Sequence, residues 1–343
     1  MKRVVLMALV GVLVLAGRAV AQPVGTLENL FDKTAITDQD RQQIRTWATT
    51  MANNLATNND ADRRGMIAAR DAIISVGRKE GRSPAFYQAF GEEAINALKA
   101  AEKKAVGQDA RVNLLTAVAE LRRVEGIELL RTALEKDPYP AARYWAAKGL
   151  SMVADAVIEK NTPRLEADIS DSIAKIIDAE TSPVMLLWLF DALGRFDHEK
   201  AHDVLADAAA KAVTRVSVAD PIASQVADGI VRSLEKAYMR EVRPEAKTRI
   251  LSAFAVLCAS ILPPKKNEPD PLLISLNASL EKITGEKVGF IATDDGVMQK
   301  LALLEWVEKF VREKKIPKRP SLPPALEDAL KDIVGGPGGA LTP

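Results

Sequence analysis

Residues 121–150 read LRRVEGIELLRTALEKDPYPAARYWAAKGL, and this stretch decides the fold. Apolar residues recur at helical spacing on both sides of a single break, the segment DPYP at 137–140. The two stripes comprise Ile127, Leu130 and Leu134 before the break and Ala142, Trp145, Ala146, Gly149 and Leu150 after it. Each predicted helix is too short to be stable alone, so the pair must stack on neighbouring helices. This predicts an all-α repeat architecture.

The rest of the chain alternates in the same way between helix and turn. Thr37, followed three residues later by Asp40, predicts the start of the first helix, and Gly77 is expected to end the second in a left-handed conformation. Further helices are expected at about 86–98, 112–121, 165–178, 183–196, 198–213, 222–239, 245–262, 276–283, 297–314 and 324–334. Gly285 is expected to end the helix before it, and Asp294 or Asp295 to cap the helix at 297–314.

Breaks between helix pairs recur at an irregular interval. They fall at Asp109, Pro140, Pro183 and Pro221, which are 31, 43 and 38 residues apart. A period near forty residues fits the two-helix repeats of an α-solenoid better than a helical bundle. We therefore expect a stack of antiparallel helix pairs, an α-α superhelix.

The segment LEKDPYPAARYWAAKGL resembles the turn and second helix of a HEAT repeat. The residues that carry this resemblance are Leu134, Asp137, Arg143, Ala147 and Leu150. A second segment, LGRFDHEKAHDVL, which begins at Leu193 and Gly194, is similar to the HEAT-like repeats of the phycobilisome-lyase type. The resemblance covers residues 86–262 and implies an armadillo-like helical fold that binds partners, without inherited catalytic residues. LEKITGEKVG, near residue 285, resembles a segment found near the end of exported bacterial HEAT proteins.

These patterns predict five parts of the chain. Residues 1–21 have a basic start, a short apolar run and a small-residue cleavage site, as in a signal peptide. The parts that follow are N-terminal helices at 22–85, the HEAT-like region at 86–262, a C-terminal helical cap at 263–334 and a disordered tail at 335–343. The protein is therefore expected to be exported to the periplasm or beyond, with no stable membrane span after cleavage.

Composition excludes several classes of function. The chain of 343 residues is 48% hydrophobic and 27% charged, the balance of a globular protein. Cleavage would remove three basic residues and no acidic one, which lowers the formal net charge from +1 to −2. Such a chain has no electrostatic case for binding nucleic acid. Cys258 is the only cysteine, so no internal disulfide forms, and its apolar surroundings predict a buried thiol.

One motif suggests chemistry. His198, Glu199 and His202, which include the only two histidines, spell H-E-x-x-H. On a helix this spacing places both imidazoles on one face to bind zinc, and the glutamate activates the metal-bound water. The alternative function is therefore a zinc-dependent hydrolase of the metallopeptidase type, with Glu235 or Glu241 as a third ligand.

Other features favour a structural role for the motif. Lys200 and Asp203 place charge where such enzymes normally have none, and Asp197 is expected to cap a helix that the motif opens. The repeat pattern also accounts for these residues as a turn and a solvated first helical turn. We therefore expect no catalytic residue, no cofactor and no metal ligand.

A second enzyme class considered is the all-helical toroid of secreted polysaccharide lyases and hydrolases. Its sites use paired carboxylates and aromatic platforms for sugar rings. Aromatic residues make up only 5% of this chain. All four tryptophans, Trp47, Trp145, Trp188 and Trp306, fall at helical core spacing and are expected in the core. The expected function is thus a non-catalytic exported scaffold that binds a protein or peptide partner.

Overall fold

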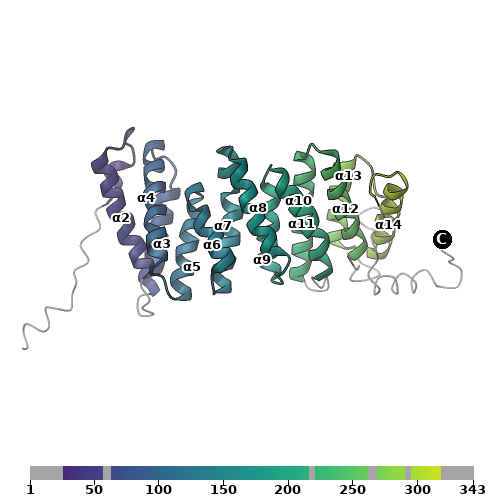
Figure 1. Ribbon diagram of the computed structural model, residues 1–343, viewed down its shortest axis with the longest axis horizontal. Coiled ribbons are helices and arrows are strands. Elements are labelled where there is room, and N and C mark those ends of the chain that lie inside the picture. The colour runs from purple at the N-terminus through teal and green to yellow at the C-terminus, as the bar shows by residue number, and fades with distance from the viewer. Residues whose placement is uncertain (1–25, 57–62, 216–220, 262–268, 290–294, 318–343) are drawn as a thin grey trace, which may run out of the picture. The chain divides into compact units, whose positions relative to one another are not determined.

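The computed structural model describes residues 26–56, 63–215, 221–261, 269–289 and 295–317 (Figure 1). The expected signal peptide, the short helix near 324–334 and the tail at 335–343 lie outside the described residues. Within the described ranges every regular element is a helix. The chain divides into two compact units between Ala105 and Val106.

In its described residues, the first unit contains three α-helices that pack on one another. They are α2 (Asp38–Ala56), α3 (Arg63–Arg78) and α4 (Pro84–Glu102), preceded by the 3-10 turn η1 (Glu28–Leu30). Buried side chains from all three helices form the core: Ile44, Trp47, Leu55, Ile73, Phe86 and Phe90. The predicted HEAT-like region began at residue 86, within α4. The main contacts of α4 are with α2 and α3.

The ends of these helices test two local predictions. The start of α2 is confirmed, because Asp40 N–H donates to Thr37 Oγ1 at 3.2 Å and Thr37 N–H donates to Asp40 Oδ2 at 3.1 Å. The prediction for Gly77 is wrong. Helix α3 continues to Arg78, and the left-handed conformation falls on Gly81 in the following loop, where φ is +84°.

The second unit contains ten α-helices in its described residues. They are α5 (Gln108–Leu121), α6 (Ile127–Lys136), α7 (Pro140–Glu159), α8 (Pro163–Ile177), α9 (Pro183–Arg195), α10 (Glu199–Arg215), α11 (Pro221–Arg240), α12 (Pro244–Ser260), α13 (Pro271–Thr284) and α14 (Gly296–Arg312), with the 3-10 turn η3 (Val124–Gly126) before α6. Proline begins α7, α8, α9, α11, α12 and α13, a position where its missing N–H costs nothing.

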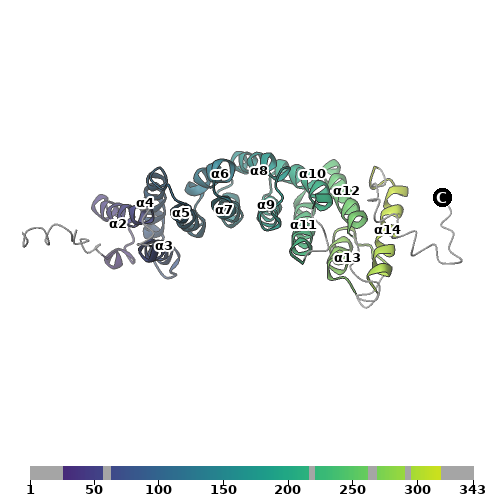
Figure 2. The same ribbon diagram turned by 90° about the horizontal axis from the view of Figure 1, so that it is seen from below.

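These ten helices form two layers. Helices α5, α7, α9, α11 and α13 contact one another in succession, and α6, α8, α10, α12 and α14 do the same (Figure 2). Each helix also packs on the next in the chain, so the main contacts reach one or two places along the sequence. This alternation is the packing of a helical-repeat solenoid, which confirms the all-α prediction. Within this unit the main contacts do not join α5 or α6 to α13 or α14, so its ten described helices do not close into the ring that a helical toroid requires.

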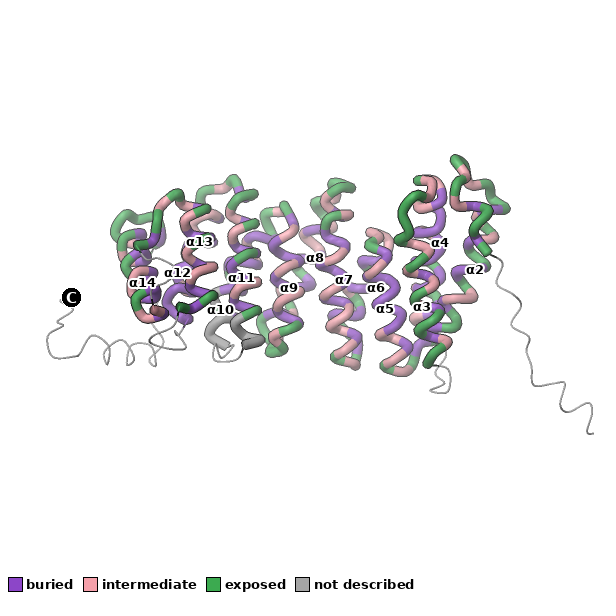
Figure 3. The backbone as a smooth tube through the Cα atoms, turned by 180° about the vertical axis from the view of Figure 1, so that it is seen from behind, coloured by how far each residue is buried: buried purple, intermediate pink, exposed green. Residues whose placement is uncertain are grey.

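Buried residues recur along every helix of both units (Figure 3). Cys258 is fully buried, as predicted, and burial raises the pKa of its thiol to about 12. Helix α9 carries the run VMLLWLF, which is apolar on every side, yet only part of it is buried. Leu189 and Phe190 are inaccessible to solvent, whereas Val184 is 41% exposed.

Two later helix ends agree with the sequence. Gly285 follows α13 in the left-handed conformation, with φ +72°. Asp295 caps α14 by accepting the backbone N–H groups of Val297 and Met298 at 3.0 and 2.9 Å. Both ends therefore depend on residue types whose local chemistry is visible in the sequence.

Candidate functional site

The first histidine of the H-E-x-x-H motif caps a helix. His198 lies immediately before α10, and its Nδ1 accepts the backbone N–H of Lys200 at 3.1 Å. The buried carboxylate of Glu166, on α8, accepts the backbone N–H groups of both Asp197 and His198 at 2.9 Å each. The prediction that Asp197 caps α10 is therefore wrong, since Asp197 instead forms an ion pair with Arg240.

The second histidine is buried, which corrects the expectation of a solvated turn. His202 is 2% exposed, and each of its ring nitrogens faces an oxygen. Nδ1 lies 2.9 Å from Oε2 of Glu241, and Nε2 lies 3.1 Å from the carbonyl oxygen of Phe196. His202 thus joins the turn before α10 to the turn between α11 and α12. An oxygen atom lies against each ring nitrogen, so a metal could reach neither nitrogen without displacing one of these contacts.

The expected third ligand is part of the same network. Arg243 bonds both carboxylate oxygens of Glu241, at 3.1 and 2.8 Å, and holds the pKa of Glu241 well below its usual range. Glu199, the general base of the alternative, is exposed and lies 3.4 Å from Arg243. Glu235 instead bonds Ser279 and Lys282 on α13.

These positions do not assemble a zinc site. Across the described residues no three histidine, cysteine, aspartate or glutamate side chains converge in a way that could hold a metal ion. The sequence did not indicate the roles of Glu166 and Glu241. The only signal was a carboxylate 31 residues before Asp197 or 39 residues after His202, which is too common to be specific.

The residues of the HEAT resemblance occupy structural positions. Leu134, Ala147, Leu150 and Leu193 are buried in the helix interfaces. Asp137 is buried in the turn between α6 and α7, where its Oδ2 accepts Arg111 Nε at 2.6 Å and its Oδ1 accepts Tyr139 N–H at 3.0 Å. Arg143 donates to the carbonyl oxygen of Asp137 at 2.9 Å.

Gly194 marks a close approach between α9 and α11. A Cβ at this position would lie 2.7 Å from Cα of Ser233. No side chain larger than hydrogen fits there unless one helix moves. The glycine of the sequence motif therefore sets the spacing of two neighbouring helices in the same layer.

Polar contacts link α7, α9, α11 and α13, which are neighbours in one layer, and we call this series the polar ladder. Asp191 on α9 bonds Ser151 on α7 and also pairs with Arg195 at 2.8 Å and with Lys236 on α11 at 3.6 Å. Burial opposes ionisation of Asp191, but the bonds from Ser151 and Arg195 bring its pKa below its usual range. On α13, Ser275 donates to Asp228 at 2.6 Å. Most charges along this face are thus paired within the chain.

The surface between α7 and α9 differs from this ladder because it is aromatic. Lys148 Nζ lies 4.4 Å from the ring centroid of Trp145 and 5.4 Å from that of Trp188. Both tryptophans are half-buried, so the prediction that all four lie in the core holds only for Trp47 and Trp306. The indole Nε1 of Trp188 has no hydrogen-bond partner among the described residues. Tyr144 and Val184 extend this surface, which we call the α7–α9 patch.

Comparisons with known proteins add limited information. No protein-family model and no curated protein sequence matches the chain. A designed armadillo repeat protein, solved in complex with the peptide (KR)4, is 15% identical and has a TM-score of 0.46; the match covers 69% of this chain and 99% of that one. An engineered protein is 16% identical with a TM-score of 0.39, over 76% and 100% of the two chains.

The class of protein follows from the packing of the described helices: this is a helical-repeat α-solenoid. Among the described helices, none combines the length and apolar character that crossing a bilayer requires. The tryptophan pair and the polar ladder both lie on helices of its α5–α13 layer.

Proposed function

We propose that this protein is a non-catalytic scaffold, exported after cleavage of residues 1–21, that binds a protein or peptide partner at the α7–α9 patch. The observation that carries the proposal is the pair of half-exposed tryptophans on either side of Lys148. Tryptophan and tyrosine are enriched among the few residues that carry most of the affinity of a binding surface. A solenoid presents such residues on a continuous face, because each repeat contacts only its neighbours.

The surroundings of the patch support the same function. Asp155, Asp191 and Arg195 lie on the same two helices and are paired with one another. They form a polar border beside an apolar centre, the usual arrangement of a binding surface. Lys148, by contrast, contacts aromatic rings and has no carboxylate within 4 Å in the described part of the chain. It is therefore free to meet an acidic or carbonyl group of a partner.

A peptide-display selection against the mature protein tests this proposal. The selected peptides are then titrated against wild type, a Trp145→Ala/Trp188→Ala double variant and Lys148→Glu. Removing the tryptophans is expected to weaken binding by about tenfold or more, because the central aromatic contacts carry most of the affinity. Circular dichroism checks that each variant remains folded.

The matched control is Lys175→Ala, on α8 in the other layer, whose side chain is 68% exposed. This variant is expected to bind the peptides as wild type does. Equal binding to wild type and to both patch variants would contradict the proposal, as would a selection that yields no specific peptide.

A further inference from the structure

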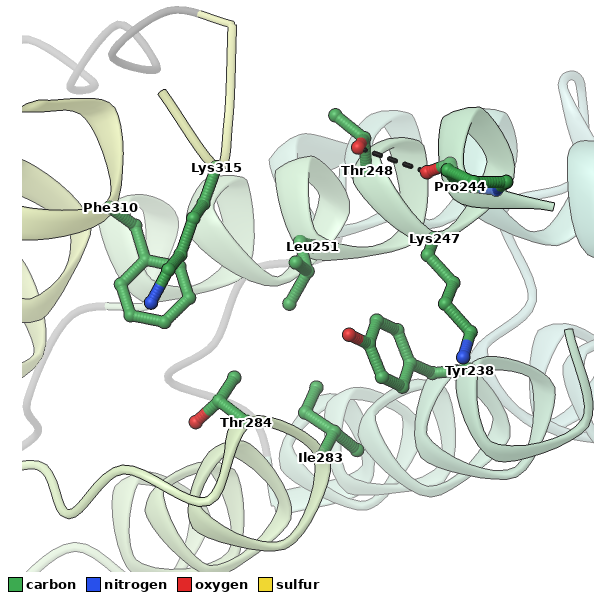
Figure 4. A pocket seen from close by; sticks show the side chains of 9 residues that line it. All are labelled: Tyr238, Pro244, Lys247, Thr248, Leu251, Ile283, Thr284, Phe310 and Lys315. Carbon is green, nitrogen blue, oxygen red and sulfur yellow. Dashed lines mark hydrogen bonds between the residues drawn. The ribbon is translucent and has the colours of Figure 1, made fainter. Parts of the chain in front are cut away.

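A separate cavity lies among the last four helices of the second unit. Its volume is about 340 Å³. Its lining comes from Tyr238 of α11, Pro244, Lys247, Thr248 and Leu251 of α12, Ile283 and Thr284 of α13, Phe310 of α14, and Lys315 (Figure 4). This cavity, which we call the α11–α14 pocket, is large enough for a small ligand or a single terminal residue of a peptide.

The pocket combines an apolar interior with polar groups. Leu251, Ile283 and Phe310 are buried and supply the apolar surface. The hydroxyl group of Tyr238 points into the space between Leu251 and Ile283 (Figure 4). This hydroxyl has no hydrogen-bond partner within the described residues, so a donor is available inside a partly apolar cavity.

The two lysines of the pocket differ in their electrostatic state. Lys315 pairs with Glu286 at 2.6 Å and with Glu313 at 2.9 Å, which neutralises its charge. Lys247 has no carboxylate within 4 Å in the part of the chain that the structure describes. Its Nζ lies over the ring of Tyr238, 5.1 Å from the centroid. An uncompensated cation therefore lies over the ring of Tyr238, whose hydroxyl has no partner among the described residues.

The backbone adds to this positive potential. Pro244 is the first residue of α12, so the N-terminal end of this helix borders the pocket. No side chain of the capping residue bonds that end, and the carboxylate of Glu241 accepts the backbone N–H of Arg243, the residue before the helix, at 2.9 Å. The partial positive charge of a helix N-terminus favours an anion, in the same direction as Lys247.

We propose that the α11–α14 pocket binds a carboxylate attached to an apolar body. The carboxylate accepts hydrogen bonds from Lys247 and the Tyr238 hydroxyl, and the apolar body lies against Leu251, Ile283 and Phe310. A small aliphatic acid and the C-terminal residue of a peptide share this chemistry. The inference is independent of the α7–α9 patch, because the residues that carry it lie on α11, α12, α13 and α14.

Calorimetric titration of the mature protein with three probes tests the inference. The probes are octanoate, the free acid of N-acetyl-Val-Leu and the C-terminal amide of the same dipeptide. At least one free acid is expected to bind, and the amide is expected to bind about tenfold or more weakly than its acid, because a charge-assisted hydrogen bond is lost. Tighter binding of the dipeptide acid assigns a peptide C-terminus, whereas tighter binding of octanoate assigns a small aliphatic acid.

Variants distinguish binding through the proposed contacts from non-specific binding. Lys247→Met keeps the apolar stem and is expected to weaken the free acid by about tenfold or more, and Tyr238→Phe by about threefold or more. Lys175→Met is the control, since Lys175 is an exposed lysine on α8 that belongs neither to the pocket nor to the α7–α9 patch. It is expected to leave acid binding unchanged.

Three results would overturn the inference. They are the absence of acid binding at concentrations up to about 10 mM, equal affinity for acid and amide, and wild-type affinity in both Lys247→Met and Tyr238→Phe. If Lys247→Met fails to fold, Tyr238→Phe alone decides, because it removes only one oxygen. None of these results bears on peptide binding at the α7–α9 patch.

Discussion

The sequence motif around His202 suggested zinc binding, but the contacts of its side chain indicate a structural role. Its ring bridges Glu241 and the carbonyl oxygen of Phe196, so the side chain stabilises the contact between the turn before α10 and the turn between α11 and α12. Zinc would have to displace the contact of the nitrogen that it binds and would meet no third ligand among the described residues. The imidazole is therefore a structural residue at the place where the sequence suggested a ligand.

The structural role of His202 can be measured. His202→Ala is expected to lower the free energy of unfolding by about 2–4 kcal/mol, because it leaves a cavity and removes one contact each from the buried carboxylate of Glu241 and the buried carbonyl of Phe196. His198→Ala, which removes only a helix cap, is expected to cost about 1 kcal/mol. Urea denaturation of both variants checks the order.

Zinc provides the corresponding control for His202. Added zinc is expected to leave the midpoint of thermal unfolding unchanged in wild type, since a ligand stabilises only a state that binds it. A zinc-dependent rise that His202→Ala abolishes would contradict the structural role. So would equal losses of stability in the two histidine variants.

Lys300 predicts a dependence of stability on pH. Its ammonium is buried in α14, where it donates to the carbonyl oxygens of Cys258 and Ile261 at the end of α12. Burial lowers the pKa of Lys300 to about 7. Between that pKa and the usual value near 10.5, the unfolded chain binds a proton that the folded chain does not. The contribution of Lys300 to stability therefore rises with pH across this window.

A Lys300→Met variant isolates that contribution from other titrating groups. The difference in free energy of unfolding between wild type and variant is expected to change by at most about 1.4 kcal/mol per pH unit between pH 7 and 10, in favour of wild type at higher pH. Urea denaturation at several pH values gives the difference. A constant difference across this range would show that Lys300 does not titrate as the geometry implies.

At the scale of the helix, the close contact of α9 with α11 depends on Gly194, which has no Cβ. Gly194→Ala would normally strengthen a helix interior by about 1 kcal/mol. Here the new Cβ would lie 2.7 Å from the backbone of Ser233. The substitution is therefore expected to lower the free energy of unfolding by about 1–3 kcal/mol, as overpacking does. A rise in stability, measured by urea denaturation, would contradict this close approach.

The helices also show which features of local structure could be predicted from the sequence. Helix starts at Thr37 and Asp295 and the end at Gly285 were predicted correctly, because a cap depends on neighbours within three residues. Helix α9 was predicted as a helix, but the exposure of Val184 was not. Periodicity cannot locate the covered side of a run that is apolar all round, since that depends on where α7 and α11 lie.

At the scale of the molecule, each repeat contacts only its neighbours. A destabilising substitution is therefore expected to affect only the helices near it. Gly194→Ala is expected to increase amide hydrogen exchange in α9, α11 and the helices packed on them. Exchange in α2, α3 and α4, which form the first unit, is expected to be unchanged. Hydrogen-exchange mass spectrometry of wild type and variant makes the comparison. A uniform increase over both units would contradict this one-dimensional behaviour.

The repeating pattern of 121–150 was enough to predict helices, their pairing and the solenoid class, because these depend on apolar spacing and turn residues close in sequence. The burial of His202 against Glu241, the exposure of Trp145 and Trp188 and the pocket beside Lys247 were not predictable in this way. They depend on side chains 39 residues apart for His202 and Glu241, and on helices that meet only when the repeats stack. Helices and turns depend on residues that are close in sequence. The partners of a buried or surface side chain depend instead on how one repeat stacks on the next.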